Sequence, residues 1–178
     1  FHPQRWLLHL AAQVEAAGGR VIEGEVVVDV QERDGIPLVE THSFDPDARE
    51  RRTVSAQHVV IATHYPILDR ALFFTRLGQT RDLVVSGPVT GTAIEGMYLD
   101  VDDGYSLRTA PGAPDRLIVG GGQHPPGTRS DQDRLFGELA GWARDTVGLQ
   151  EVSHRWSAHD LTTPDSVPVI GRTRFDNL

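Results

Sequence analysis

The feature that constrains this fold most is the apolar run from His58 to Ile61 (HVVI), which leads into Ala62-Thr63. β-Branched residues in succession, rather than alternating with polar ones, are typical of a strand buried on both faces. The run ends before Pro66, because the residue preceding a proline is biased away from helix. Its small final side chains leave room for another backbone or a flat ligand. The run therefore predicts a core strand with an abrupt turn, which either is purely structural or borders a ligand.

Composition narrows the class of protein. A chain of 178 residues with 39% hydrophobic and 24% charged residues is globular, and it fits one domain with a small appendage. A net charge of −8 argues against a nucleic-acid partner. No apolar run reaches the roughly 18 residues that a membrane span requires, and cysteine is absent. We expect no nucleic-acid partner, no membrane and a cytoplasmic location.

The first third of the chain predicts one helix and one hairpin. Apolar residues recur at helical spacing from Pro3 to Ala17, and Gly18-Gly19 supplies the stop. Strands are expected at 25–30 and 36–42, with a charged loop over 45–52. Residues 1–66 thus read as a helix, a hairpin and the returning strand described above. Because the chain begins at Phe1 and ends without a closing helix, we expect it to be a piece of a longer protein.

Residues 67–171 predict a meander of short strands with a second helix. Strands at 97–101 and 105–109 flank an Asp-Asp-Gly turn, and a third strand is expected to end at Gly120-Gly121-Gly122. The helix spans 131–147, with Ser130 as a candidate cap and Gly148 as the stop. A last strand is expected at 154–161. The sum is an α+β fold with a mostly antiparallel sheet and a few flanking helices.

Sequence motifs exclude several kinds of chemistry. Neither glycine-rich turn has the strand, turn and helix context of a dinucleotide-binding fingerprint, and the chain contains no lysine for a phosphate-binding loop. The eight histidines lack metal-ligand spacing, so we expect no metal site. No G-x-S-x-G nucleophile turn occurs. Trp156, His159 and Asp160 stand before the sequence PVIG at 168–171, which favours either a pocket wall or a core tryptophan beside a capped turn.

Four stretches then carry a resemblance to a known family. They are the helix Pro3–Gly19 followed by E-x-x-V at 23–26, the VVIAT run, the strands at 96–108 and 117–122, and W-x-x-x-D-x-x-T-x-D-x-x-P-x-I-G at 156–171. Together they resemble the D-amino acid oxidase type of FAD-dependent oxidoreductase, which includes glycine and sarcosine oxidases. The last stretch is most similar to the branch in which such an oxidoreductase is fused to a Rieske iron–sulfur domain. The family's flavin-binding ends are missing, and His64 stands where the family has a glycine.

The resemblance implies a function and a set of site residues. The chain is expected to be the substrate-binding domain of a two-dinucleotide-fold flavoprotein, with 172–178 beginning a C-terminal flavin-binding segment. The parent protein would bind FAD and oxidise an amine or amino acid by hydride transfer, and the chain alone would be inactive. Catalytic residues stay unknown. The residues expected at the cofactor are Val26, Ala62, Thr63 and His64, and those expected at the substrate are Tyr98, Tyr105, Arg108, Trp156 and His159.

Two alternative functions, and two interpretations of Arg108, stay open from the residues alone. A non-catalytic ligand-binding or interaction module would share the fold without flavin chemistry. A piece of an FAD-dependent halogenase or hydroxylase would share the strand pattern, although it fits the stretch at 156–171 less well. Arg108 is the residue whose two interpretations differ most, because a guanidinium can hold a substrate carboxylate in a two-pronged pair or can simply project from a surface strand.

Overall fold

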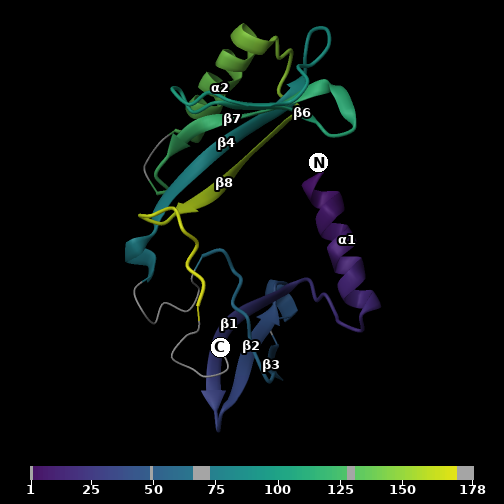
Figure 1. The fold of residues 1–178 in the computed structure, drawn as a ribbon, viewed down its shortest axis with the longest axis vertical. Coiled ribbons are helices and arrows are strands. Elements are labelled where there is room, and N and C mark those ends of the chain that lie inside the picture. The colour runs from purple at the N-terminus through teal and green to yellow at the C-terminus, as the bar shows by residue number, and fades with distance from the viewer. Residues whose placement is uncertain (1, 49, 66–72, 128–130, 172–178) are drawn as a thin grey trace. The chain divides into compact units, whose positions relative to one another are not determined.

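The computed structural model describes residues 2–48, 50–65, 73–127 and 131–171 of the chain (Figure 1). The chain divides into two compact units. One unit is formed by residues 77–164, and the other by residues 2–76 with the segment that begins at Asp165. The predicted domain boundaries at 66/67 and 171/172 fall at stretches outside the described residues, so they stay predictions. The candidate cap Ser130 and the expected flavin-binding start at 172–178 also lie outside the described residues.

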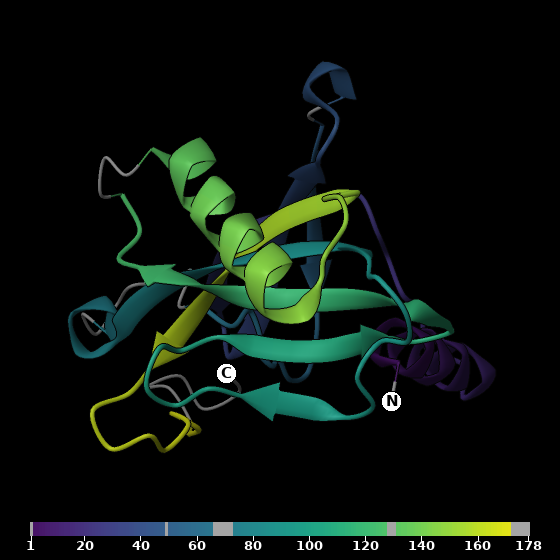
Figure 2. The same cartoon turned by 90° about the horizontal axis from the view of Figure 1, so that it is seen from above.

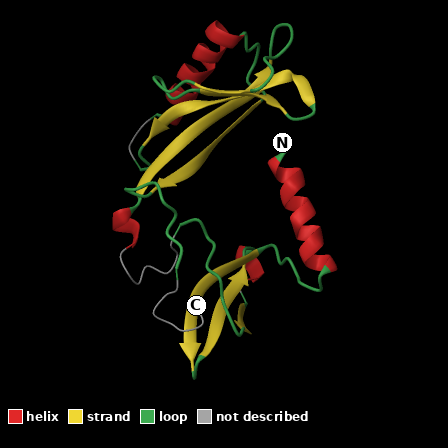
Figure 3. Cartoon of the chain, in the orientation of Figure 1, coloured by secondary structure: helices red, strands yellow, loops and turns green. Residues whose placement is uncertain are grey.

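The unit of residues 77–164 is built on one antiparallel sheet (Figure 3). Its strand order is β5-β6-β7-β4-β8, so the predicted hairpin and meander are confirmed. Strand β8 pairs with β4 and not with β7, the strand that precedes it in the sequence. Strand β4 therefore lies between β7 and β8 in the sheet. The strands are β4 (Gly78–Pro88), β5 (Met97–Leu99), β6 (Ser106–Ala110), β7 (Ala113–His124) and β8 (His154–Thr162).

Helix α2 (Gln132–Val147) covers one face of this sheet (Figure 2). Alternate residues of β4 and β7 point toward the helix, and Leu83, Val85 and Val119 are fully buried there against Leu139. The predicted helix is confirmed, and Gly148 closes it with a left-handed φ of 69°. Its amino-terminal cap is Asp131, whose carboxylate accepts a hydrogen bond from the backbone N–H of Arg134. Among the described residues of this unit, no helix lies on the opposite face of the sheet.

The glycine triplet does not end its strand, which corrects the prediction. β7 runs through Gly120, Gly121 and Gly122 to His124, and it stays paired with β4 across an irregularity in register near Leu83. Glycine is unfavourable within strands as a rule, but here the paired neighbours supply the ladder that a sequence pattern cannot see.

The second unit contains α1 (Pro3–Ala16) and a three-stranded antiparallel sheet in the order β1-β2-β3. The predicted helix and hairpin are confirmed as α1 and as β1 (Glu25–Arg33) with β2 (Ile36–Ser43). The stretch 45–52, expected to be a charged loop, contains a 3-10 turn, η1 (Pro46–Ala48), and its last two residues begin strand β3 (Arg51–Ser55). A second 3-10 turn, η2, spans Phe73–Arg76. Neither α1 nor α2, the described helices, is long and apolar enough to cross a membrane.

The run from His58 to Ile61 is not a strand, and this prediction is wrong. The described residues on both sides of it include no strand that pairs with it, and Val60 is 87% exposed. β-Branched residues favour an extended backbone, but a strand also requires a hydrogen-bonded neighbour. Among the described residues of this second unit, only Val30 and Pro37 are fully buried. Trp6, Leu7 and Leu8 of α1 are more than half exposed.

Candidate functional site

A hollow lies on the sheet face opposite α2. Its volume is about 210 Å³, which is below the range of about 300–1,000 Å³ typical of pockets for drug-sized ligands. Strand register explains why its lining residues meet. Ser106, Gly120, Val84 and Trp156 stand directly opposite one another across β6, β7, β4 and β8, and a second row follows two residues along. The lining residues are Val84, Met97, Tyr98, Ser106, Leu107, Arg108, Ile118, Gly120 and Trp156.

Arg108 is the charged residue of this hollow. It lies on β6 opposite Ile118, and its side chain is half-buried. Its guanidinium makes no hydrogen bond or ion pair with any residue of the described ranges. Elsewhere in the same sheet, Arg155 is paired with Asp133 at 2.7 Å. A half-buried cation without a partner is costly, because burial removes hydration that no other group replaces. Arg108 can therefore hold an anion.

Three of the five expected substrate residues lie together at this hollow. Tyr98 borders it at the β5 edge, where its hydroxyl donates a hydrogen bond of 2.7 Å to the backbone carbonyl of Glu95. Trp156 borders it from β8 and is 41% exposed. Arg108 lies between them in the strand order, so the hollow joins a cation to two aromatic side chains.

The other two expected substrate residues lie elsewhere. The Tyr105 ring stacks on the Trp142 ring of α2, with centroids 4.1 Å apart and planes 16° from parallel, so it packs on the covered face. His159 is three residues from Trp156 on one strand, and an odd separation points two side chains to opposite faces. Its Nε2 accepts a hydrogen bond of 3.2 Å from Arg81 Nε. Neither residue lines the hollow.

Several lining residues were missed by the sequence reasoning, namely Val84, Met97, Ser106, Ile118 and Gly120. Strand alternation on β6 would have placed Ser106 beside Arg108, because the two are separated by two residues. The partners on β4 and β7 could not be found in this way, since their register is a long-range property. Local sequence therefore predicts only those lining residues of the hollow that share a strand with an expected site residue.

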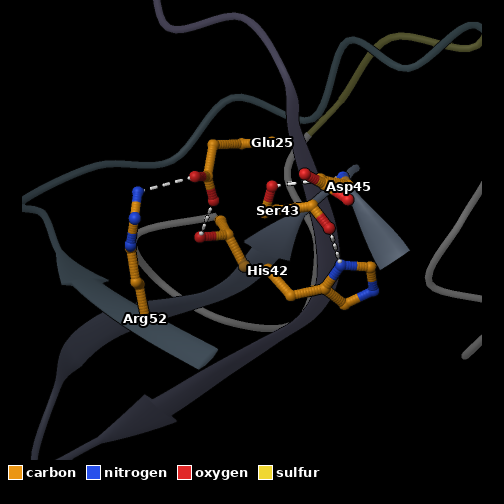
Figure 4. A network of polar contacts seen from close by, with 6 residues as sticks. Glu25, His42, Ser43, Asp45 and Arg52 are labelled. Atoms are coloured by element: carbon orange, nitrogen blue, oxygen red, sulfur yellow. Dashed lines mark hydrogen bonds and ion pairs between the residues drawn. The ribbon is translucent and has the colours of Figure 1, made fainter. Parts of the chain in front are cut away.

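Val26, an expected cofactor residue, lies on β1 opposite His42. Strand β1 is at the edge of its sheet, so its outer side has no strand partner in the part of the chain that the structure describes. The neighbouring Glu25 accepts hydrogen bonds from Arg52 Nη1 at 2.7 Å and from Thr41 Oγ1 at 2.8 Å (Figure 4). These contacts tie β1 to β2 and β3, and they hold the backbone at Val26 in place.

The other expected cofactor residues, Ala62, Thr63 and His64, form an exposed turn in the same unit. The backbone N–H of Tyr65 donates to the Thr63 carbonyl at 2.7 Å, and Thr63 Oγ1 donates to the Tyr65 carbonyl at 2.7 Å. Between them, His64 has a φ of 63°, which is uncommon outside glycine. His64 thus adopts a left-handed backbone conformation that favours glycine, the residue that the family resemblance expects at this position.

No metal centre is formed by the residues that the structure describes, since they include no group of three or more His, Asp or Glu side chains able to hold an ion. Carboxylates gather at the turn after β5, where Asp100 Oδ1 accepts hydrogen bonds from the backbone N–H groups of Asp102 and Asp103. That arrangement stabilises the turn.

Comparison with known proteins gives consistent results. The model of the family described as FAD dependent oxidoreductase matches residues 1–178. A curated Bacillus subtilis (strain 168) protein, the Rieske 2Fe-2S iron–sulfur protein YhfW, is 29% identical over 174 residues, which are 96% of this chain and 33% of YhfW.

Two solved structures show the same fold. Glycine oxidase from Bacillus cereus is similar with a TM-score of 0.65 at 14% identity, over 94% of this chain and 45% of that one. A flavoprotein/dehydrogenase from Cytophaga hutchinsonii has a TM-score of 0.58 at 12% identity, over 86% of this chain and 41% of that one. The expected α+β fold is therefore confirmed. The chain spans about a third of its curated relative and less than half of these solved chains.

Proposed function

Because the chain belongs to the family of FAD-dependent oxidoreductases, we propose that it is the substrate-binding part of an enzyme that oxidises an amine or amino acid. The single observation that carries this proposal is Arg108. Its half-buried guanidinium has no hydrogen-bond or ion-pair partner among the described residues, and it lines the hollow on the sheet face opposite α2. A guanidinium holds a carboxylate through two parallel hydrogen bonds, which also fixes the carboxylate's orientation.

The remaining walls of the hollow suit a small organic acid. Trp156 and Tyr98 offer flat aromatic surfaces, and Val84 and Ile118 are apolar. Their combination with one cation matches the usual design of small-molecule sites, which are mostly apolar with a few well-placed polar groups. In this proposal, these side chains exclude water and hold the substrate, while Arg108 orients it by its carboxylate.

FAD is the cofactor of this family, and the described residues fit only the border of its site. Val26 on an open sheet edge and the exposed turn at Ala62-Thr63-His64 are the proposed contacts. A glycine-rich turn for the pyrophosphate is not found in these 178 residues. When bound, the flavin would supply the redox chemistry, as acceptor of the hydride removed from the carbon next to the substrate nitrogen.

The same proposal extends to the longer protein. The match to YhfW over one third of that protein supports a parent chain that also carries an iron–sulfur domain. We place the parent in the cytoplasm, in keeping with a chain that contains no cysteine for disulfides. The 178-residue part is expected to be inactive alone, because its FAD contacts are incomplete. The second candidate function is a non-catalytic ligand-binding module, which the same hollow would also serve.

The test is an absorbance spectrum of the purified full-length protein followed by anaerobic addition of amines and amino acids. Flavin bands that bleach with one of these compounds are the expected result. A colourless protein that takes up no added FAD would refute the oxidoreductase and favour the non-catalytic ligand-binding module.

The role of Arg108 has its own variant. Arg108→Met should weaken the affinity for carboxylate substrates by about 10- to 100-fold, because a hydrogen bond to a charged group contributes about 1.5–3 kcal/mol. Arg134→Met on the exposed side of α2 is the matched control, since Arg134 pairs only with the neighbouring Glu138. Equal behaviour of the two variants would refute a substrate contact at Arg108.

A further inference from the structure

Three consecutive glycines cross the sheet at β7, and two of them have a structural reason. A Cβ on Gly121 would lie 2.5 Å from the Tyr105 ring, so glycine is needed for the ring to pack there. Gly122 has a φ of 64°, a backbone conformation that side chains rarely adopt. Neither reason applies to Gly120.

Gly120 has an ordinary extended backbone, since it is not among the glycines of positive φ. A Cβ built there would come within 3 Å of one atom only, the Ser106 Oγ at 2.6 Å, and the next atoms are 3.9 Å away. A serine hydroxyl can rotate out of the way. Alanine would therefore fit the fold at position 120, and the missing side chain calls for another explanation.

The position of Gly120 in the hollow explains why it has no side chain. Gly120 lies between Ser106 on β6 and Val84 on β4, in the row that ends at Trp156. We infer that Gly120 and Ser106 form the floor of the substrate site and limit the size of the group that it accepts. This inference rests on the proposed function, because it concerns the same site.

The floor and the cation define the class of ligand. Arg108 and Ser106 are two residues apart on one strand, so their side chains stand roughly 7 Å apart on one face. If the carboxylate of a ligand pairs with Arg108, a chain of only a few atoms beyond the carboxylate is enough to reach Gly120. The Ser106 hydroxyl makes no hydrogen bond with any side chain or backbone group in the described ranges, so it is available to a polar group of the ligand. The site takes short aliphatic carboxylates, including amino acids with small side chains.

The experiment measures binding by isothermal titration calorimetry on the full-length protein, with acetate, propanoate, butanoate and pentanoate as probes. Gly120→Ala should weaken butanoate and pentanoate binding by about 10-fold or more, because a single methyl group in an apolar pocket discriminates by about 10- to 200-fold. Acetate should be affected less than about threefold. Gly137→Ala is the control, since a Cβ there meets nothing within 4 Å.

The outcomes separate the two proposals. Equal weakening of all four acids by Gly120→Ala, or no weakening at all, would overturn the inference. The same holds if none of the acids binds the unaltered protein. A length-dependent loss in a protein whose flavin no amine or amino acid reduces would support the floor while refuting the proposed oxidation. If an amino acid reduces the flavin but the effect of Gly120→Ala does not depend on the length of the acid, the proposed oxidation is supported and the inference about Gly120 is refuted.

Discussion

Gly121→Ala provides the strictest test of how the sheet packs against α2. The added methyl would lie 2.5 and 2.9 Å from two carbons of the Tyr105 ring and 3.3 Å from Leu139 Cδ1. Tyr105 cannot simply swing away, because its ring is stacked on Trp142 at 4.1 Å. The methyl must therefore displace either the stacked pair or the α2 side chain beneath it.

The expected loss of stability follows from two contributions. Overpacking of a well-packed core costs about 1–3 kcal/mol. Disturbing a stacked aromatic pair costs about 0.5–1.5 kcal/mol more. Replacing glycine by alanine recovers up to about 1 kcal/mol through the unfolded chain. We expect a net loss of about 1–3 kcal/mol for Gly121→Ala, whereas Gly120→Ala next to it should change the free energy of unfolding by less than about 1 kcal/mol.

Urea denaturation of the full-length protein, followed by circular dichroism, would measure both variants. A double-mutant cycle with Tyr105→Ala gives the decisive comparison, since removal of the ring should relieve most of the cost of Gly121→Ala. Additive effects of the two substitutions would refute the packing argument. So would equal losses for Gly120→Ala and Gly121→Ala.

Two further predictions concern the same unit. Gly87→Ala should be the most damaging glycine substitution, because a Cβ there would lie 1.8 Å from the Glu151 carbonyl oxygen, a backbone atom that cannot rotate away. We expect the free energy of unfolding to fall by more than about 3 kcal/mol. The thermal midpoint should drop strongly in this variant and not in Gly137→Ala. Asp131→Ala should lower stability by about 1 kcal/mol through loss of the α2 cap, and Asp131→Asn should restore most of it, so a thermal midpoint unchanged in the alanine variant would contradict the capping role.

Local sequence predicted the elements whose signals are short-range. Helix α2 has an apolar period of a helix, a capping residue and a closing glycine, and all three lie within its own residues or directly beside them. The hairpin of β5 and β6 is likewise encoded by one Asp-Asp-Gly turn between two short strand-like stretches. Arg108 was also singled out from local sequence, because a cation three residues after Tyr105 on an expected strand can be noticed without knowing its neighbours.

The faces of the sheet were less accessible. Tyr105 and Trp156 were expected on one pocket wall, yet they lie on opposite faces of the sheet. The alternation along β8 already separates Trp156 from His159, and this signal was available in the sequence. Tyr105 is different, since only its stacking on Trp142, more than thirty residues away in the chain, assigns it to the core.

By itself, the sequence determined the local backbone of the two helices and of the tight hairpin turns, but it missed most of β3 and ended β7 too early. It could not determine partners, and the run from His58 to Ile61 shows the reason. Its residues favour an extended backbone wherever they are placed, but a strand exists only where another strand offers hydrogen bonds. The tertiary structure decided that β4 lies between β7 and β8, and this pairing brings Gly120, Arg108 and Trp156 to one hollow.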